Sequence, residues 1–290
     1  MDAKTKLFCV IGDPIEHSLS PAMHNAVFKK LGLNCAYAAF RVAPENLGSA
    51  VKGMKVMNFG GANVTIPHKV DVINFLDELS EEARIIGAVN TIKFGEKLVG
   101  YNTDGYGALK ALVNNDANPE NKKILILGSG GAARAIAVML ALTGKVASLT
   151  MLGVIEEELK KLVDDINKGT KIRATGKMMS EETKGEEIAR ADILIHCTPV
   201  GMHPKKDETL ATKDMLRKGL VVMDIVYNPL ETKLLKEAKK AGAKTIGGIE
   251  MFVNQGAASE KIWLGIDAPV ELMRRVVLKE LKQRKSRSTA

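Results

Sequence analysis

Residues 122–144 constrain the fold of this chain more than any other segment. They read KKILILGSGGAARAIAVMLALTG, which is a short apolar run, a glycine-rich turn and an alanine-rich run that ends at Gly144. A strand, a glycine-rich turn and a helix in this order open the βαβ unit of a dinucleotide-binding Rossmann fold. We therefore predict that a doubly wound parallel sheet begins here.

The turn at residues 128–133 fits the pattern G-x-G-x-x-A, and its chemistry suits an anion. Gly128 would permit the tight turn, Gly130 would let the backbone approach a pyrophosphate, and the small Ala133 would let helix and strand pack closely. Free N–H groups at the start of the helix would then bind the phosphates. A purely structural turn is the alternative, but the strand before it and the helix after it favour a dinucleotide site.

The end of the next strand, at residues 150–155, usually decides which dinucleotide binds. An acidic residue there binds the ribose 2′-hydroxyl of NAD, whereas Arg favours the 2′-phosphate of NADP. The segment reads TMLGVI, and the first acidic residue, Glu156, falls in the next expected helix. These residues alone leave the choice between NAD and NADP open.

Strand-like and helix-like segments alternate along the rest of the chain and predict an α/β protein. Strands are expected at residues 7–11, 35–42, 62–66, 147–152, 192–197, 220–226 and 244–246, and helices at 20–32, 71–79, 104–113 and from about 249. Ser20 is the expected N-cap of the first helix, with Pro21 at its first position. The polar stretch NNDANPEN at residues 114–121 is the expected linker, so a first domain would span residues 1–113.

Composition narrows the class of protein. Hydrophobic residues make up 46% of the 290 residues, enough for a packed core, and no apolar run approaches the ~20 residues that span a bilayer. The three cysteines form no CxxC pair, so we expect reduced thiols and a cytoplasmic location. The five histidines show no metal-binding spacing, so no metal is expected.

The net charge of +8 is concentrated at the end of the chain, where residues 274–290 hold seven Lys or Arg and one Glu. A basic tail can bind nucleic acid or another acidic partner, but it can also be a solvated helix end. No RNA-binding motif and no interleaved aromatic residues accompany the charge. The solvated helix end is therefore favoured, and no nucleic-acid partner is expected.

Four polar motifs precede the linker: HSLSP at residues 17–21, ANVTIPHK at 62–69, GAVNT at 87–91 and YNTDG at 101–105. They lie where strands give way to turns or helices, and ligands of open α/β sheets gather at the carboxyl ends of strands. Their hydroxyl, amide and charged groups suit a small polyhydroxy acid. Lys69 and Asp104 could exchange a proton with an alcohol or ketone while a hydride moves. A surface ion pair with turn-capping neighbours is the alternative for these two residues.

Together, these motifs resemble the shikimate dehydrogenase family over nearly the whole chain. The motifs S-x-S-P, N-V-T-x-P-x-K, G-A-V-N-T, N-T-D-G and G-S-G-G-A follow one another in the family's order. After them come T-P-x-G-M at residues 198–202, D-x-x-Y-N-P at 224–229 and G-x-x-M-x-x-x-Q at 248–255. The resemblance implies an N-terminal α/β substrate domain, a Rossmann domain at residues 114–249, and C-terminal helices from about 250 to 290 that return to the first domain.

The resemblance also implies the reduction of 3-dehydroshikimate to shikimate with NADPH, a step toward chorismate and the aromatic amino acids. Lys69 and Asp104 would form the catalytic pair, and Ser18 and Ser20 would bind the substrate carboxylate. The full set of implied substrate contacts is Ser18, Ser20, Asn63, Thr65, Lys69, Asn90, Asp104, Tyr227 and Gln255. The implied cofactor contacts are Gly128, Ser129, Gly130, Gly131, Ala132, Thr198, Gly248 and Met251.

The chain departs from the family pattern at two places. The family commonly has Asn-Arg-Thr after the second Rossmann strand, where Arg and Thr bind the 2′-phosphate, whereas this chain has Gly153, Val154 and Ile155. NADP is the expected cofactor, and NAD is an alternative because the usual Arg is absent. In addition, His196 and Cys197 replace an Asn and a small residue before the Thr-Pro pair.

Two other functions compete with this interpretation. The related quinate dehydrogenases often have Thr at the second serine of S-x-S, which is Ser20 here, so shikimate is favoured over quinate. A non-catalytic dinucleotide-sensing homologue would not need Lys69, Asp104 and Gln255. The expected partner is thus a small-molecule substrate, bound by a monomer or homodimer without membrane association.

Overall fold

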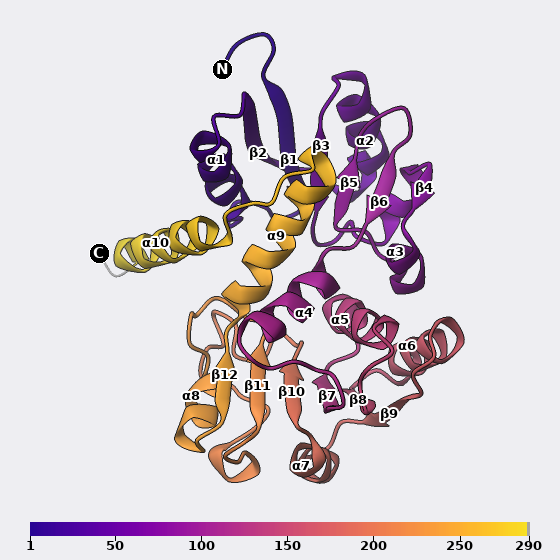
Figure 1. Ribbon diagram of the computed structural model, residues 1–290, viewed down its shortest axis with the longest axis vertical. Coiled ribbons are helices and arrows are strands. Elements are labelled where there is room, and N and C mark those ends of the chain that lie inside the picture. The colour runs from indigo at the N-terminus through magenta and orange to yellow at the C-terminus, as the bar shows by residue number, and fades with distance from the viewer. Residues whose placement is uncertain (289–290) are drawn as a thin grey trace. The chain divides into compact units, whose positions relative to one another are not determined.

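The computed structural model describes the backbone of residues 1–288 and the side chains of residues 1–284, and the chain forms two compact units. The first unit comprises Met1–Thr103 and the chain from Val253 onward, and the second comprises Asp104–Phe252. The chain enters the second unit before the polar stretch at residues 114–121. The reason is that helix α4 (Asp104–Asn114) packs on helix α5 (Gly131–Leu142) of that unit (Figure 1).

A six-stranded sheet forms the centre of the first unit. Its strands are β1 (Lys6–Gly12), β2 (Cys35–Arg41), β3 (Gly61–Val64), β4 (Glu78–Leu79), β5 (Thr91–Lys93) and β6 (Val99–Tyr101). They lie in the order β2-β1-β3-β5-β6-β4. Strands β2 and β3 run parallel to β1, β5 runs antiparallel to β3, and β6 runs antiparallel to β5. The carboxyl ends of β1, β3 and β6 and the start of β5 therefore share one edge of the sheet.

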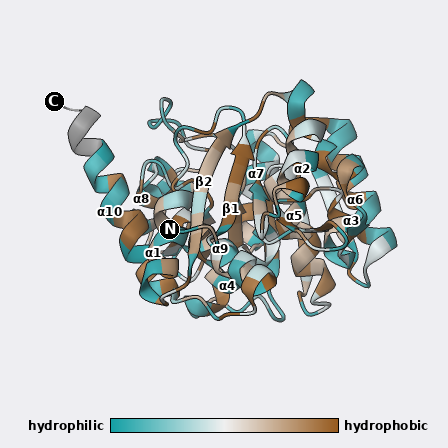
Figure 2. Cartoon of the chain, turned by 90° about the horizontal axis from the view of Figure 1, so that it is seen from above, coloured by the Kyte–Doolittle hydropathy of each residue, from teal (hydrophilic) through white to brown (hydrophobic). Residues whose placement is uncertain are grey.

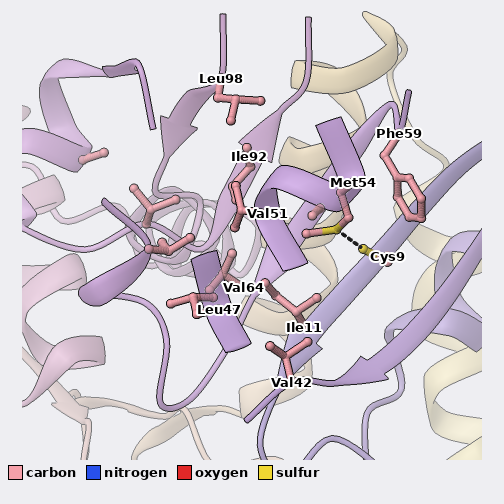
Figure 3. Close-up of a cluster of buried hydrophobic side chains, with 14 residues drawn as sticks. Cys9, Ile11, Val42, Leu47, Val51, Met54, Phe59, Val64, Ile92 and Leu98 are labelled. Atoms are coloured by element: carbon pink, nitrogen blue, oxygen red, sulfur yellow. Dashed lines mark hydrogen bonds between the residues drawn. The ribbon is translucent and has the colours of Figure 1, made fainter. Parts of the chain in front are cut away.

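Helix α2 (Leu47–Val56) covers one face of this sheet with an apolar stripe. Its buried residues Leu47, Val51 and Met54 recur at intervals of one helical turn. In Figure 3 they meet side chains of β1, β3 and β5, and the Met54 sulfur lies 3.3 Å from the Cys9 thiol. Since each fully buried aliphatic side chain contributes roughly 1.5–3 kcal/mol, this cluster holds β1 and β3 firmly in place. These are the strands whose ends carry the first two polar motifs.

The other face of β1 packs against α1 (Ser20–Lys30) and α9 (Gly248–Leu264). Cys9 belongs to the cluster under α2, whereas Phe8 and Val10 pack with Phe28 and Trp263 on the opposite face. Alternation between two buried faces explains why the strand is hydrophobic along most of its length (Figure 2).

The start of α1 differs from the sequence-based prediction. Ser20 is the first helical residue, and the N-cap position belongs to Leu19, which provides no side-chain cap. The prediction that Ser20 is the N-cap was therefore wrong. The reason is that the Ser18 hydroxyl accepts the Ser20 N–H at 3.3 Å, so the earlier serine provides the local oxygen acceptor.

The prediction of a helix at residues 71–79 was also wrong. The segment forms a 3-10 helix, η2 (Asp71–Phe75), followed by strand β4. The backbone N–H and the side chain of Asp77 bond the carbonyl and N–H of Leu98 at 2.9 and 2.7 Å. This pairing directs the chain into the sheet after η2. Helices α2 and α3 (Glu81–Ile86) and the short strands β5 and β6 were not predicted.

The second unit contains a six-stranded sheet in which every pair of neighbouring strands is parallel. Its strands are β7 (Lys123–Leu127), β8 (Ser148–Gly153), β9 (Ala174–Met178), β10 (Ile193–His196), β11 (Val221–Asp224) and β12 (Lys244–Ile246). The order β12-β11-β10-β7-β8-β9 reverses direction between β7 and β10, as in a doubly wound Rossmann sheet. The predicted α/β fold class is confirmed, although β9 was not predicted.

Helices complete both units. The remaining ones are α6 (Glu156–Gly169), α7 (Glu181–Arg190), α8 (Lys233–Lys240), α10 (Val270–Ser288) and the 3-10 helices η1 (Pro44–Asn46) and η3 (Lys213–Met215). No helix within residues 1–288 has the length and apolar character of a membrane span. Helix α10 carries most of the basic segment at residues 274–290, whose last two residues lie outside the described part of the chain.

Candidate active site

The four polar motifs meet at one edge of the first sheet. Because of the strand directions, this edge carries the residues that follow β1, β3 and β6 and the residue that precedes β5. Asn63 pairs in register with Thr91, and Thr91 pairs with Tyr101. Val64 donates its N–H to Asn90 O at 2.8 Å, so the second and third motifs are joined directly. Segments far apart in sequence are thus brought to one surface.

Asn63 is the centre of a buried hydrogen-bond network. Its Oδ1 accepts the Tyr37 hydroxyl at 2.7 Å. Its Nδ2 donates to Asn90 O at 3.2 Å, to Thr91 Oγ1 at 3.1 Å and to Ser259 Oγ at 3.0 Å. Every polar atom of the side chain is bound within the protein, which makes Asn63 a support for its neighbours. Sequence reasoning singled out Asn63 but missed Tyr37 and Ser259, which belong to no polar motif.

Lys69 follows a tightly constrained turn. If Gly12 carried a side chain, its Cβ atom would lie 2.4 Å from the Thr65 side chain. The turn after β3 therefore packs closely on the end of β1. The imidazole Nε2 of buried His68 lies 2.7 Å from Val42 O, and Lys69 O accepts the Val89 N–H at 2.7 Å. These bonds fix the backbone on both sides of a half-buried Lys69. Sequence reasoning did not find the anchoring role of His68.

Gln255 reaches the same network from α9. Its Oε1 accepts from Thr103 Oγ1 at 3.5 Å, within the first unit. One turn later, Ser259 Oγ lies 2.9 Å from Thr91 Oγ1 and donates to Gln255 O at 3.1 Å. The C-terminal part of α9 therefore belongs to the same constellation as Asn90 and Thr103.

Ser18 lies in the turn before α1 and Ser20 is the first residue of that helix, and the C-terminal helix contacts this turn. The Arg284 guanidinium donates to His17 O at 2.7 Å and to Ser18 O at 3.3 Å. At least one basic side chain of residues 274–290 therefore forms hydrogen bonds within the first unit. A fixed cation next to Ser18 also makes this turn favourable for an anionic group.

Asp104 is the first residue of α4 and is buried, with 8% of its surface exposed. Its backbone continues directly from Thr103. The following glycine is required by packing, because a Cβ on Gly105 would lie 2.3 Å from Ala135 O of α5. Lys69 belongs to the first unit and Asp104 to the second, as does Tyr227, whose ring centroid lies 5.2 Å from that of Phe252.

The glycine-rich turn follows β7, at the point where the order of the second sheet reverses. Gly128 has a φ of +120°, and a Cβ there would lie 3.0 Å from Cys197 O in the turn after β10. In contrast, Cβ atoms on Gly130 and Gly131 would meet no atom within 4 Å. The protein itself does not require glycine at these two positions. Open space beside the N-terminus of α5 fits a closely approaching pyrophosphate.

The end of β8 lies beside this turn but provides no cation. A Cβ on Gly153 would lie 2.9 Å from Ser129 Oγ, so glycine allows the serine to pack there. Val154 and Ile155 are exposed, at 71% and 50%. Arg134 in the first turn of α5 forms an ion pair with Asp165 of α6. The residues that usually bind a 2′-phosphate are therefore replaced by exposed apolar side chains.

His196 forms a buried polar chain at the other side of the switch point. Its Nδ1 lies 2.9 Å from Asp224 Oδ1, and its Nε2 lies 2.6 Å from Thr198 Oγ1. Thr232 donates to the second carboxylate oxygen of Asp224 at 2.5 Å. Sequence reasoning marked His196 as unusual and Asp224 as part of a motif, but it gave neither of them a role.

Gly248 lies where α9 begins, against the turn after β11. A Cβ on Gly248 would lie 2.3 Å from Ile225 O, so glycine is needed for α9 to begin against the turn after β11. Met251, one turn later, is buried.

Cys197 follows β10 rather than lying in it, which corrects the prediction of a strand over residues 192–197. Burial raises the pKa of its thiol.

The protein is a two-unit α/β protein whose second unit is of the Rossmann type. The strand order of the second sheet and the glycine-rich turn define this class. The family model "Shikimate dehydrogenase substrate binding domain" matches residues 10–92, and "Shikimate 5'-dehydrogenase C-terminal domain" matches residues 248–278. The chain is 48% identical to the NADP(+) shikimate dehydrogenase of Methanosarcina acetivorans over 284 residues, covering 96% of this chain and 99% of that protein. The chain belongs to the shikimate dehydrogenase family.

Solved structures agree with this assignment. A shikimate dehydrogenase in complex with NADP+ is 43% identical, with a TM-score of 0.89 and 97% of both chains covered. The shikimate 5-dehydrogenase of Listeria monocytogenes, in complex with shikimate and NAD, is 37% identical, with a TM-score of 0.91 and coverage of 96% of this chain and 98% of that one.

Proposed function

We propose that this chain catalyses the reversible, NADP(H)-dependent reduction of 3-dehydroshikimate to shikimate, on the route to chorismate and the aromatic amino acids. The observation that carries the proposal is the meeting of four polar motifs at one sheet edge, where Asn90 and Thr103 bond each other and Lys69 is held on a fixed turn. Closely spaced amide and hydroxyl groups suit a ring that carries several hydroxyls and a carboxylate. Membership of the family supports the same reaction.

Most of the residues that would bind the substrate belong to the first unit, whereas Asp104 and Tyr227 belong to the second. Ser18 and Ser20 would bind its carboxylate, and Thr65, Asn90 and Asp104 its ring hydroxyls. Gln255 and Lys69 would lie close to the ring, Tyr227 would close over it, and Asn63 would keep Asn90 in position. A substrate that lacks one hydroxyl would leave a buried partner unpaired and would be rejected.

The second unit would bind the cofactor. Gly128, Ser129, Gly130, Gly131 and Ala132 would hold the pyrophosphate, and Thr198, Gly248 and Met251 would line the nicotinamide end. NADPH held by these residues would supply the hydride for the carbonyl carbon of 3-dehydroshikimate. The open space at Gly130 and Gly131 supports this placement.

Lys69 would move the proton, with Asp104 as the other member of the catalytic pair. In the direction of reduction, the Lys69 ammonium donates a proton to the carbonyl oxygen as it becomes a hydroxyl. In the reverse direction, the neutral amine accepts the hydroxyl proton. Such a group, when well positioned, accelerates a reaction about 10²- to 10⁴-fold.

An NAD-dependent quinate or shikimate dehydrogenase is the second candidate. It is favoured by one observation, which is that Gly153, Val154 and Ile155 offer no cation for a 2′-phosphate. The Listeria relative was solved with shikimate and NAD, so NAD is compatible with this fold. A non-catalytic dinucleotide sensor is the third candidate, and an intact Lys69 argues against it. We place the protein in the cytoplasm, as a monomer or homodimer with a small-molecule substrate.

Product identification tests the proposal. The full chain is incubated with shikimate and NADP+, and the organic product is identified by mass and chromatography. We expect a product two hydrogens lighter than shikimate that comigrates with 3-dehydroshikimate. Quinate in place of shikimate gives the comparison. Faster conversion of quinate with NAD+ would favour the second candidate, and no product from any pair would favour the sensor.

A further inference from the structure

We infer that His196 is a positioning residue that makes the Thr198 hydroxyl a hydrogen-bond acceptor toward the carboxamide of a bound nicotinamide. The inference rests on the cofactor site of the proposed function. His196 and Asp224 end the adjacent parallel strands β10 and β11, where they pair in register. Their side chains are buried, at 2% and 0% exposure. The chain from Asp224 through His196 to Thr198 is therefore shielded from water until it reaches the Thr198 hydroxyl.

The hydrogen-bond partners fix the direction of each proton. Asp224 Oδ2 accepts the Thr232 hydroxyl, and Oδ1 accepts the Val226 N–H at 3.0 Å. A carboxylate only accepts hydrogen bonds, so the proton between Asp224 and His196 belongs to Nδ1. The Nε2 atom of a neutral imidazole is then an acceptor. With the ring in this neutral form, the Thr198 hydroxyl, 2.6 Å away, donates its single proton to Nε2.

Once its proton is committed to His196, Thr198 has only lone pairs to offer to a ligand. One of them already accepts the Val200 N–H at 3.2 Å. The other suits an N–H donor. A nicotinamide carboxamide presents an NH₂ group, whereas an acetyl group at the same position presents none.

The position of Thr198 places this acceptor at the dinucleotide site. Thr198 follows β10 at the point where the strand order reverses, which is where doubly wound sheets bind their ligands. The turn that carries it touches the glycine-rich turn, since Cys197 O lies 3.0 Å from the Cβ position of Gly128. Thr198 is half-buried, so part of its surface is open to a ligand.

Two substitutions of His196 separate positioning from support of the fold. His196→Asn keeps a donor near the Nδ1 position and can satisfy Asp224, but it offers nothing at the Nε2 position. His196→Gln can place its carbonyl oxygen near the Nε2 position and accept from Thr198. The remaining donors of Asp224, Val226 N–H and Thr232, are unchanged in both. If His196 only supports the fold, His196→Asn should weaken NADP+ binding less than His196→Gln. If His196 positions Thr198, His196→Gln should weaken it less.

The test uses the full chain and three probes, measured by calorimetric titration. They are NADP+, its 3-acetylpyridine analogue, and adenosine 2′,5′-bisphosphate, which lacks the nicotinamide end. We expect Thr198→Val and His196→Asn to weaken NADP+ binding about 5- to 20-fold, the effect of one hydrogen bond, and to leave adenosine 2′,5′-bisphosphate unchanged. His196→Gln should stay within about 3-fold of wild type. The preference of the wild type for NADP+ over the acetylpyridine analogue should disappear in Thr198→Val.

The inference is overturned if His196→Asn and Thr198→Val bind NADP+ like the wild type. It is also overturned if the two substitutions weaken the binding of adenosine 2′,5′-bisphosphate as much as the binding of NADP+. Failure of the wild type to bind NADP+ would overturn it as well. Thr175→Val, on an exposed part of β9, is the matched control and should change nothing. Turnover with shikimate is measured separately on the wild type. If NADP+ binds as expected without any turnover, the proposed function fails while the role of His196 stands.

Discussion

Asn90 and Thr103 bond each other through several pairs of atoms, among them the Thr103 hydroxyl and Asn90 Oδ1 at 3.2 Å. The Thr103 N–H donates to Asn90 Oδ1 at 2.8 Å, and Asn90 Nδ2 donates to Thr103 Oγ1 at 3.0 Å. The bonds join the start of β5 to the end of β6, and so they tie the third polar motif to the fourth. A ligand that meets Asn90 therefore meets a side chain already held in one orientation, which reduces the entropy lost on binding.

Ser259 supports this arrangement from α9, and its removal should lower stability. Ser259→Ala deletes the contacts with Asn63 and Thr91 at 3.0 and 2.9 Å. We expect the free energy of unfolding, measured in urea, to fall by about 1–2 kcal/mol, because buried polar groups lose a partner. Ser49→Ala on the exposed side of α2 is the control and should change it by less than about 0.5 kcal/mol. Equal effects of the two variants would contradict the network.

Lys69→Ala should lower kcat far more than it raises KM for shikimate. A proton-transfer group acts mainly in the transition state, so kcat should fall about 10²- to 10⁴-fold. Steady-state kinetics at saturating NADP+ measure the effect. Lys52→Ala, exposed on α2, is the charge-matched control. A Lys69→Ala enzyme with kcat near that of wild type would mean that the lysine is not the proton donor.

Val154→Arg should improve the use of NADP+. Val154 is 71% exposed at the end of β8, so an Arg can be accommodated without disturbing the core. A guanidinium there could form a bidentate contact with a 2′-phosphate, so KM for NADP+ should fall about tenfold while KM for NAD+ stays the same. The ratio of the two KM values gives the answer. An unchanged KM for NADP+ would show that another group of the chain already binds the phosphate.

Arg284 should matter for substrate binding although it is exposed and close to the end of the chain. Its bonds to His17 O and Ser18 O hold the turn that would bind the carboxylate. Arg284→Ala should raise KM for shikimate about 3- to 10-fold with little change in kcat. Lys282→Ala is the neighbouring control. Removal of the residues after Lys279 should reproduce the Arg284→Ala effect, and an unaltered KM in the truncated chain would contradict it.

The cysteines should differ in reactivity. Burial raises the pKa of Cys9 to about 12 and also raises the pKa of Cys197, so both thiols stay protonated at pH 8. The thiolate is the reactive form, and burial raises the pKa of the Cys35 thiol less than the pKa values of Cys9 and Cys197. We expect a disulfide reagent to modify Cys35 first in the native protein, with the other two reacting after unfolding. Cys35→Ser should remove the early phase, and fast native labelling of Cys197 would refute this assignment.

The fold could be predicted where local pattern and tertiary structure agree. The glycine-rich turn at residues 128–133 lies between a strand and a helix as expected, because its apolar strand is buried on both sides. Short strands such as β5 and β6 have no periodicity of their own and exist only because they pair with β3 and with each other. Their presence depends on contacts between distant segments.

The same distinction applies to the candidate site. The polar motifs around Ser18, Lys69 and Asn90 could be found because they interrupt strand and helix patterns. Tyr37, Ser259 and Arg284 could not, since each lies in an ordinary stretch of strand or helix and gains its role from a neighbour far away in sequence. His196 could be flagged by its identity, but its partner Asp224 was revealed by the register of β10 and β11.

The most direct test of the central claim is the absorbance of reduced nicotinamide when purified protein is mixed with shikimate and NADP+. The same assay is repeated with NAD+ and with quinate. We predict a steady increase in absorbance with shikimate and NADP+ that depends on both compounds and is abolished in Lys69→Ala. Folded wild-type protein that gives no increase with any of the four pairs would contradict the account and leave dinucleotide binding without catalysis.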